Sequence, residues 1–533
     1  MTIFDFGQNI TGWVKIRYRS HPGRLFTIRF AEMLNSDGTL YTLNYRSAHS
    51  TDYLITSGPL EEVKTWEPRF TFHGFRYVQV DGFQFANAPN FIEATAVVIH
   101  SDLPNTGKFE CGDDKVNQLY SNITWGQRDN FLEIPTDCPQ RDERLGWTGD
   151  AQVFCATAAC NQNVSAFFRK WLRDQREAQF PDGSGAIIVP NLFPEWKGEA
   201  GWADALVIVP WIMYQRYADI SFLQEGYDSM RAWIIYRRDT ATNLIPTKNS
   251  LGDWLALAKT ETPKNLIGTA YFAFTTELMA RTAALLGKKQ DADYFHQLCA
   301  EIKLAFQREF LDESGLLTAR TQTACVLALH FDLLPESSRA KNAELLRDLI
   351  AQNGMKLDTG FLGTAYLTLV LAENNLHETA YSLLLQEEYP SWLFSVNQGA
   401  TTIWERWNSY TREGGFGDVL MNSFNHYAYG AVGEWMFKYV AGLDYETPGG
   451  KILLFRLVPD KRLGFAKASL QTPYGLATCG WQFLADGNLC WNIQIPPNTS
   501  AKIEIPEFFS RESIPATVQS GQYQFVIRSK NEK

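Results

Sequence analysis

The most informative part of this sequence is a short, densely charged stretch. It reads Thr136-Asp137-Cys138-Pro139-Gln140-Arg141-Asp142-Glu143-Arg144-Leu145-Gly146-Trp147-Thr148-Gly149-Asp150. It holds four carboxylates, two arginines and a tryptophan within fifteen residues, and its glycines and proline exclude one uninterrupted helix. A loop with this mixture of charges beside a large aromatic ring is suited to presenting an acid to a polar, neutral ligand such as a sugar.

Length and composition indicate several globular domains. A chain of 533 residues is too long for one core, and usual domain sizes predict roughly three or four domains. The 16 Trp, 22 Tyr and 35 Phe make the chain unusually aromatic, and rings beyond the needs of a core often serve as stacking platforms. The net charge of -10 argues against a nucleic-acid partner and against an anionic membrane surface.

The sequence shows no targeting or membrane-spanning pattern. The first residues lack a basic region followed by an apolar run, and we find no stretch of about 18 apolar residues. The eight cysteines are scattered without metal-ligand spacing, so we expect reduced thiols in a cytoplasmic protein without metal or cofactor. Only Cys479 and Cys490 are expected to face each other, on neighbouring strands of one hairpin. The oligomeric state is not indicated, and a homo-oligomer is left open.

The hydrophobic period divides the chain into three domains. Residues 1–105 alternate apolar and polar, which predicts an N-terminal β-sandwich. Residues 106–440 follow a helical period, and about a dozen helices there predict a barrel of paired helices with its chemistry in loops at one mouth. Residues 441–533 return to alternation and predict a C-terminal β-sandwich. The clearest helical segments are 163–178, 203–217, 268–286, 290–308, 337–351, 362–374 and 422–440.

Cleavage of a glycosidic bond in water requires one carboxyl group as acid and a second as base or nucleophile. The charged stretch supplies four, Asp137, Asp142, Glu143 and Asp150. A carboxyl group crowded by others and by Trp147 can have a raised pKa and keep its proton near neutral pH. Arg141 and Arg144 act in the opposite direction, so these residues alone do not select the acid. An ion-pair network at the entrance of a helix would explain the same cluster.

A second candidate carboxylate lies far downstream, in Gln398-Gly399-Ala400-Thr401-Thr402-Ile403-Trp404-Glu405-Arg406-Trp407. Two tryptophans that could line a sugar site flank Glu405, and Arg406 could orient it. Taken alone, such a run is more often interhelix packing with a local ion pair. His426 lies near the start of the predicted helix 422–440, and a lone histidine there is more often structural.

Two further tryptophans closely follow glycines in loops. They are Trp202 in Gly201-Trp202-Ala203-Asp204 and Trp254 in Gly252-Asp253-Trp254-Leu255. An exposed indole ring suits stacking on the apolar face of a sugar. The alternative is that both rings cap the core of the barrel.

Together these residues resemble the signatures of the α-L-rhamnosidases of glycoside hydrolase family 78. The first signature is similar to residues 137–150 and the second to residues 401–407. The likeness extends to Phe4-Asp5-Phe6-Gly7-Gln8-Asn9, Phe70-Thr71-Phe72-His73-Gly74-Phe75-Arg76-Tyr77, Pro473-Tyr474-Gly475 and Pro496-Pro497-Asn498-Thr499. Two long motifs so far apart are much more specific than any short pattern, so the resemblance favours a functional first loop.

The resemblance implies an inverting exo-glycosidase that releases terminal α-L-rhamnose from glycosides or oligosaccharides, with Glu143 as general acid and Glu405 as general base. The residues implied to hold the rhamnose hydroxyls are Asp137, Arg141 and Asp150. Those implied to shape the pocket are Trp147, Trp202, Trp254 and His426. The implied fold is an (α/α)6 barrel between β-sandwiches.

Members of this family commonly carry further β-domains ahead of the first sandwich. This chain is therefore expected to be a minimal member or to lack an upstream part. Two rival functions share its features: another hydrolase or a phosphorylase on the same barrel, and a non-catalytic carbohydrate-binding protein. The presence of both Glu143 and Glu405 speaks against the second.

Overall fold

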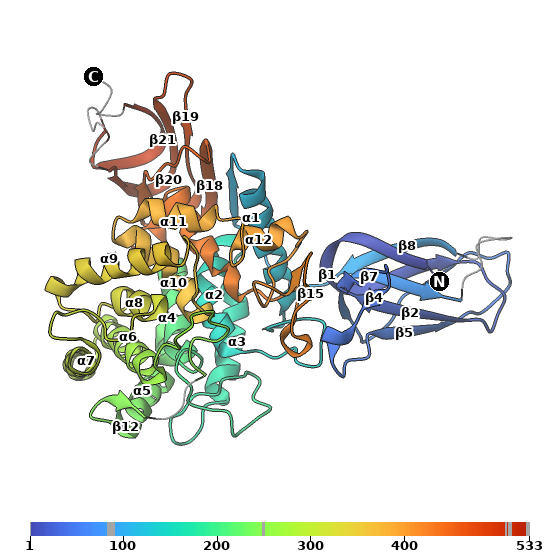
Figure 1. Ribbon diagram of the computed structural model, residues 1–533, viewed down its shortest axis with the longest axis horizontal. Coiled ribbons are helices and arrows are strands. Elements are labelled where there is room, and N and C mark those ends of the chain that lie inside the picture. The colour runs from blue at the N-terminus through green and yellow to red at the C-terminus, as the bar shows by residue number, and fades with distance from the viewer. Residues whose placement is uncertain (1, 83–90, 248–250, 507–508, 510–513, 529–533) are drawn as a thin grey trace. The chain divides into compact units, whose positions relative to one another are not determined.

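The computed structural model describes residues 2–82, 91–247, 251–506, 509 and 514–528, and the chain divides into two compact units (Figure 1). The first unit comprises Met1–Asp102, Ser121–Leu145 and Ser395–Tyr427, and the second comprises Leu103–Tyr120, Gly146–Phe394 and Ala428–Lys533. Two segments from the interior of the sequence thus fold with the N-terminal residues. These segments carry most of the first signature and all of the second.

An antiparallel six-stranded sheet forms the larger part of the first unit. Its order is β5-β2-β7-β1-β6, and β8 also pairs with β1. Alternation along the strands buries one set of side chains in an apolar core that includes Val14, Ile16, Ile28 and Phe75. The strands are β1 (Thr2–Tyr18), β2 (Leu25–Ala31), β5 (Thr51–Ile55), β6 (Lys64–Trp66), β7 (His73–Asp81) and β8 (Phe91–Val98).

Several short elements complete the first unit. A 3-10 helix, η1 (Leu43–Tyr45), follows the small pair β3 (Met33–Leu34) and β4 (Leu40–Tyr41), and a second 3-10 helix is η2 (Val419–Met421). Two-residue strands form the hairpins β10 (Phe131–Leu132) with β11 (Ile134–Pro135) and β14 (Tyr410–Thr411) with β15 (Gly415–Phe416).

Gly74 of β7 allows the loop of the first signature to lie directly against the sheet. A Cβ atom at this position would lie 2.7 Å from Cβ of Gln140 and 3.0 Å from Cγ of Pro139. The hydroxyl of Tyr45 also donates to the carbonyl oxygen of Gly74 at 2.8 Å. A larger residue at position 74 would displace the loop.

The helices of the second unit form an inner ring and an outer layer. The inner helices contact one another in the order α2, α4, α6, α8, α10, and both α10 and α2 contact the 3-10 helix η3, which closes the ring. Every residue of α2 is buried, whereas α3 and α7 each bury only one stripe, as expected for inner and outer helices. The predicted barrel of paired helices is confirmed.

The inner helices are α2 (Thr148–Asn161), α4 (Ala205–Tyr217), α6 (Lys264–Leu285), α8 (Gln322–His330) and α10 (Phe361–Glu373). The outer helices are α3 (Ser165–Glu177), α5 (Ser221–Thr240), α7 (Lys289–Phe310), α9 (Glu336–Gln352) and α11 (His377–Leu384). A small hairpin joins β12 (Ala241–Thr242) and β13 (Ile245–Pro246), while α1 (Asp114–Asn130) and α12 (Trp392–Asn397) run from one unit into the other. Within the described ranges, no helix has the length and apolar character needed to cross a membrane.

The helix predicted over residues 422–440 is wrong in its first part. Helical structure begins only with η3 (Ala428–Val432) and continues through α13 (Gly433–Trp435) and the π-helix η4 (Met436–Val440). Upstream, the hydroxyl of Ser423 binds both the backbone N–H and the carbonyl oxygen of Asn425, each at 3.1 Å. Such local side-chain bonds compete with helix formation. His426 therefore lies before the helix, in extended loop structure.

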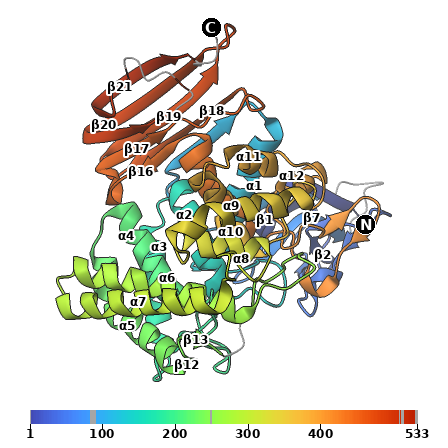
Figure 2. The ribbon, with the colours of Figure 1, turned by 60° about the vertical axis from the view of Figure 1, so that its left-hand side comes forward.

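A second sheet ends the chain, and Figure 2 shows its strands β16 to β21 side by side. Its order is β16-β17-β20-β19-β18-β9, and β21 also pairs with β20. The strands are β16 (Leu443–Tyr445), β17 (Ile452–Arg456), β18 (Phe465–Thr472), β19 (Gly475–Phe483), β20 (Leu489–Glu504), β21 (Thr517–Ile527) and β9 (Gly107–Cys111). A 3-10 helix, η5 (Pro448–Gly450), precedes β17. The last strand of the sheet order, β9, comes from the stretch before the helices, and the sequence pattern had not revealed it.

The cysteines of this second sheet do not pair. Cys479 lies opposite Ile493, and Cys490 lies opposite Gln482, so the expectation that the two cysteines face each other is wrong. The thiol of Cys479 instead accepts a hydrogen bond from the indole of Trp491 at 3.2 Å. All eight cysteines are free thiols.

Candidate active site

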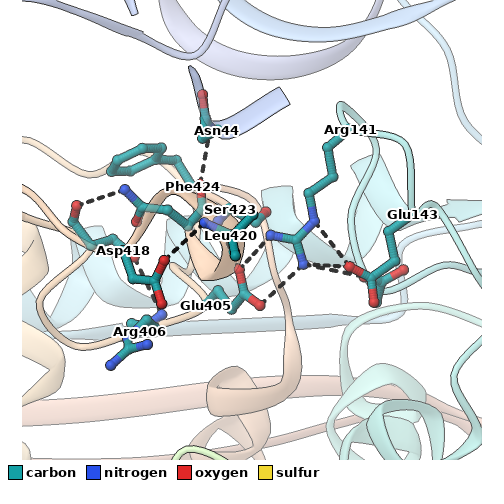
Figure 3. Close-up of polar contacts among 12 residues, drawn as sticks. Asn44, Arg141, Glu143, Glu405, Arg406, Asp418, Leu420, Ser423 and Phe424 are labelled. Carbon is teal, nitrogen blue, oxygen red and sulfur yellow. Dashed lines mark hydrogen bonds and ion pairs between the residues drawn. The ribbon is translucent and has the colours of Figure 1, made fainter. Parts of the chain in front are cut away.

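One buried guanidinium group in the first unit binds both candidate glutamates. Arg141, which is 1% exposed, donates from Nη1 to Oε2 of Glu405 at 2.8 Å and from Nη2 to Oε1 of Glu405 at 3.1 Å. Its Nε and Nη2 also donate to Oε2 of Glu143 at 3.1 and 2.7 Å. Figure 3 shows Arg141 between the two carboxylates. The two glutamates that the sequence places in separate motifs therefore meet on one side chain.

This shared contact limits the separation of the two carboxylates. Because Nη2 of Arg141 binds an oxygen of each, those two oxygens lie no more than about 6 Å apart. One guanidinium group thus holds both carboxylates in a single ion-pair cluster.

Glu405 is the more deeply buried of the two, at 3% exposure. The backbone N–H of Ser423 donates to its Oε2 at 2.8 Å, and the N–H of Glu405 donates to the carbonyl oxygen of Ser423 at 3.0 Å. Burial opposes ionisation, but the charges of His426 and Arg141 and the Ser423 hydrogen bond outweigh it and hold the pKa of Glu405 below its ordinary value. Glu405 is therefore a fixed, ionised carboxylate.

The tryptophans that flank Glu405 pack in the protein interior. Trp404 belongs to a buried cluster with Tyr41, Ala400 and Phe424, and its ring meets that of Phe424 edge-on at 5.2 Å. Trp407 is buried as well. For these two rings the packing alternative is correct, and the guanidinium that holds Glu405 comes from Arg141 of the first signature.

Glu143 is 19% exposed in its side chain and lies among positive charges. Its Oε2 accepts a third hydrogen bond, from Nη2 of Arg46 at 2.9 Å. Asp142, next to it, binds Nε of Arg46 at 2.7 Å and the hydroxyl of Ser47 at 2.6 Å. The sequence placed both carboxyl groups and arginines near this acid, and in the structure the guanidinium groups of Arg141 and Arg46 contact it.

Asp137 closes the loop of the first signature. Its Oδ1 accepts the N–H of Leu145 at 2.8 Å, its own N–H donates to the carbonyl oxygen of Leu145 at 2.9 Å, and its Oδ2 lies 3.9 Å from Nη2 of Arg141. One donor atom each of Asp137, Cys138 and His426 lie within 4.8 Å of one another. Oxygen, sulfur and nitrogen donors together are a set that could hold Zn²⁺.

The remaining predicted residues belong to the second unit. Asp150 is buried in the first turn of α2, and Trp147, just before that helix, stacks on Trp196 with ring centroids 5.8 Å apart. Trp254 is 41% exposed, as a stacking platform requires. Trp202 is only 2% exposed.

The exposed ring predicted at Trp202 is wrong. Its indole packs edge-on against Phe361 at 5.3 Å. It lies so close to Gly149 that a Cβ atom there would come within 2.7 Å of the indole nitrogen. A ring in this position supports the start of α2 from the interior of the barrel.

Several residues of the N-terminal sheet region also reach the site, and sequence reasoning missed them. Glu32, which is 1% exposed, accepts hydrogen bonds from Nδ2 of Asn9 at 2.9 Å, from Nδ2 of Asn44 at 3.0 Å and from the N–H of Phe424 at 3.3 Å. Burial raises the pKa of Glu32 to about 7. Phe424 adjoins Ser423, which holds Glu405. The sequence could have indicated Asn9, which belongs to the Phe4–Asn9 motif. Glu32, Asn44 and Arg46 belong to no motif.

Family models for three domains match successive parts of the chain. They describe a bacterial α-L-rhamnosidase concanavalin-like domain over residues 1–100, a bacterial α-L-rhamnosidase 6 hairpin glycosidase domain over residues 104–440, and a bacterial α-L-rhamnosidase C-terminal domain over residues 442–514. The helical ring and the two flanking sheet regions along the chain thus correspond to a six-hairpin glycosidase domain between two β-domains.

Individual relatives agree with these family models. An α-L-rhamnosidase of Formosa agariphila is 44% identical over 95% of this chain and 55% of its own length, and one of Streptomyces avermitilis is 43% identical over 95% and 48%. The crystal structure of Streptomyces avermitilis α-L-rhamnosidase complexed with L-rhamnose has a TM-score of 0.94 at 41% identity, covering 99% of this chain and 52% of that one. The chain spans about half the length of these relatives.

Proposed function

Since the chain belongs to the bacterial α-L-rhamnosidase family, we propose that it hydrolyses terminal, non-reducing α-L-rhamnose from glycosides or oligosaccharides. The observation that carries this proposal is the meeting of Glu143 and Glu405 on Arg141. Hydrolysis of a glycosidic bond needs two carboxyl groups in one site. Each of these two comes from a different signature.

We assign the role of general base to Glu405. A base must be ionised, and the lowered pKa of Glu405 keeps it so. Its oxygens are fixed by Arg141 and Ser423, so a water bound to it would be held in one position. Glu143 is the more accessible group and takes the role of the acid that protonates the leaving oxygen.

The sugar pocket of the proposal follows the family signatures. We infer from these signatures that Asp137, Arg141 and Asp150 bind hydroxyl groups of the rhamnose and that Trp147, Trp202, Trp254 and His426 shape its pocket. The relative complexed with L-rhamnose supports a pocket for this sugar. Trp202 would do so from a buried position, packed against Phe361.

In the proposed mechanism, Glu405 takes a proton from a water molecule that attacks the anomeric carbon. Glu143 gives its proton to the departing oxygen, and the C–O bond to the aglycone breaks with inversion of configuration.

Proton NMR of the first products from an α-L-rhamnoside tests the proposal. Release of β-L-rhamnose before mutarotation is the expected result. The α anomer appearing first would show retention, with Glu405 then acting as nucleophile. Absence of rhamnose release from both aryl and alkyl α-L-rhamnosides would refute the assignment.

A further inference from the structure

Arg46 of the N-terminal sheet region contacts both loops of the site. Its Nε binds Oδ1 of Asp142 at 2.7 Å, its Nη2 binds Oε2 of Glu143 at 2.9 Å, and its Nη1 donates to the carbonyl oxygen of Leu420 at 3.4 Å. Ser47 adds a hydrogen bond from its hydroxyl to Oδ2 of Asp142 at 2.6 Å. One guanidinium group thus links the loop of the proposed acid to the loop after the proposed base.

The backbone at Arg46 is in an unfavourable conformation. Its φ of 57° and ψ of -112° follow the last residue of η1, and its N–H donates to the carbonyl oxygen of Leu43 at 3.2 Å. A residue with a side chain rarely adopts such angles, and strain of this kind is concentrated at functional sites. The strain is retained here at the residue whose side chain reaches Glu143.

Two arginines hold the same oxygen of Glu143. Oε2 of Glu143 accepts hydrogen bonds from Arg141, which also holds Glu405, and from Arg46. Asp142 and the carbonyl oxygen of Leu420 keep Arg46 itself in place. Arg46 thus restrains the side chain of Glu143 independently of Arg141.

We propose that Arg46 is a positioning residue for the general acid: its Nη2 fixes the side chain of Glu143, while Asp142 and Leu420 fix Arg46. The inference rests on the proposed function and assigns to the N-terminal sheet region a direct part in it. Arg46 acts only through Glu143, so its contribution should appear where proton donation matters and disappear where it does not.

The test compares two kinds of substrate in Arg46→Met and Arg46→Lys. Activated aryl α-L-rhamnosides need little help from an acid, whereas alkyl α-L-rhamnosides need it fully. We expect Arg46→Met to lower kcat on the alkyl substrate about 10–100-fold and on the aryl substrate less than about threefold, a part of the 10²–10⁴-fold effect of a general acid. Lysine keeps the charge but cannot hold Asp142 and Glu143 with one planar fork, so Arg46→Lys should restore only part of the loss.

Two controls separate positioning from folding. Arg144→Met removes a neighbouring arginine that lies over the ring of Phe72, 5.4 Å from its centroid, and should leave the ratio of the two rates unchanged. The double variant of Arg46→Met with Glu143→Gln should have a ratio of alkyl to aryl kcat no lower than that of Glu143→Gln alone, because both changes remove the same function.

Three results would overturn the inference. One is equal loss on both substrates in Arg46→Met, which a merely structural residue would give. Another is a double variant in which the ratio of alkyl to aryl kcat falls by the product of the falls in the two single variants. The third is a wild-type protein that releases no rhamnose from either substrate, which refutes the proposed function first and the role of Arg46 with it.

Discussion

Glu32→Gln should change the dependence of stability on pH. Glu32 is fully buried and accepts hydrogen bonds from two asparagines and one backbone N–H, and burial raises its pKa from 4.5 to about 7. Between these pH values the native protein keeps a proton that the unfolded chain has released. Rising pH therefore lowers the free energy of unfolding through this group, and the stabilisation by the retained proton is fully lost above about pH 7.

The size of the effect follows from the shift in pKa. The difference between a pKa of 4.5 and one of about 7 corresponds to about 3 kcal/mol. Glutamine does not titrate, so the variant should lose this slope. It also turns an amide N–H₂ toward one asparagine donor, a cost of about 1–3 kcal/mol that does not depend on pH. Relative to the wild type, the variant should thus be less stable at pH 4.5 and recover by up to about 3 kcal/mol at pH 8.

Urea unfolding of both proteins at pH 4.5 and pH 8 measures this difference. Subtracting wild type from variant at each pH removes the contributions of other titrating groups. The titration of Asp129 depends on that of Glu32, because burial and, to a smaller extent, the charge of Glu32 raise the pKa of Asp129 to about 8. Asp129→Asn combined with Glu32→Gln controls for it. An equal difference between variant and wild type at both pH values would show that Glu32 does not keep its proton, and the reasoning would fail.

Four further outcomes are expected. Glu143→Gln should lower turnover of alkyl rhamnosides by something like 10²–10⁴-fold and spare activated aryl rhamnosides, and equal loss on both would contradict its role as acid. Glu405→Ala should abolish activity on both substrates; a variant with a reduced melting temperature but retained turnover would mark Glu405 as structural. In the wild type, protonation of Glu405 should not lower kcat/KM until the pH drops below 4.5, because the pKa of this group is lowered. Zn²⁺ but not Mg²⁺ should inhibit, and Cys138→Ser should weaken that inhibition without loss of turnover, as inhibition titrations of both proteins would show. Gly74→Ala should lower the melting temperature and the activity together, because its Cβ would lie 2.7 Å from Cβ of Gln140; unchanged values in both assays would show that the loop can adjust.

The sequence predicted the barrel because the helical period and the number of helices over residues 106–440 are local properties of the sequence. It predicted the two glutamates only through the resemblance of long motifs, since a Trp-Glu-Arg-Trp run on its own more often indicates packing. Trp404 does pack in a buried cluster, and Trp407 is buried. Arg46 and Glu32 could not be found in this way. Their roles depend on contacts with residues more than ninety positions away in the chain, and no local pattern records such contacts.

The helix predicted over 422–440 failed for a different reason. Its apolar spacing is real, but Ser423 bonds locally to Asn425, and backbone hydrogen bonds join this segment to Ile403 and Glu405. A tertiary requirement, the fixing of the base, overrides the periodic signal. Trp202 shows the converse, because its glycine neighbour suggested exposure, whereas Gly149 of α2 makes room for the indole in the interior.

The first unit is built from three separate segments of the chain, which limits how domains can be exchanged between this protein and its relatives. Residues 121–145 and 395–427 fold with the N-terminal residues rather than with the helices that surround them in the chain. A chimera that exchanged the N-terminal region at residue 103 would keep every residue of both signatures and yet replace Asn9, Glu32, Asn44 and Arg46, which hold the two loops. Such a hybrid would inherit the catalytic residues from one parent and their supports from the other. Residues 1–102, 121–145 and 395–427 should therefore be exchanged together when domains are swapped between relatives.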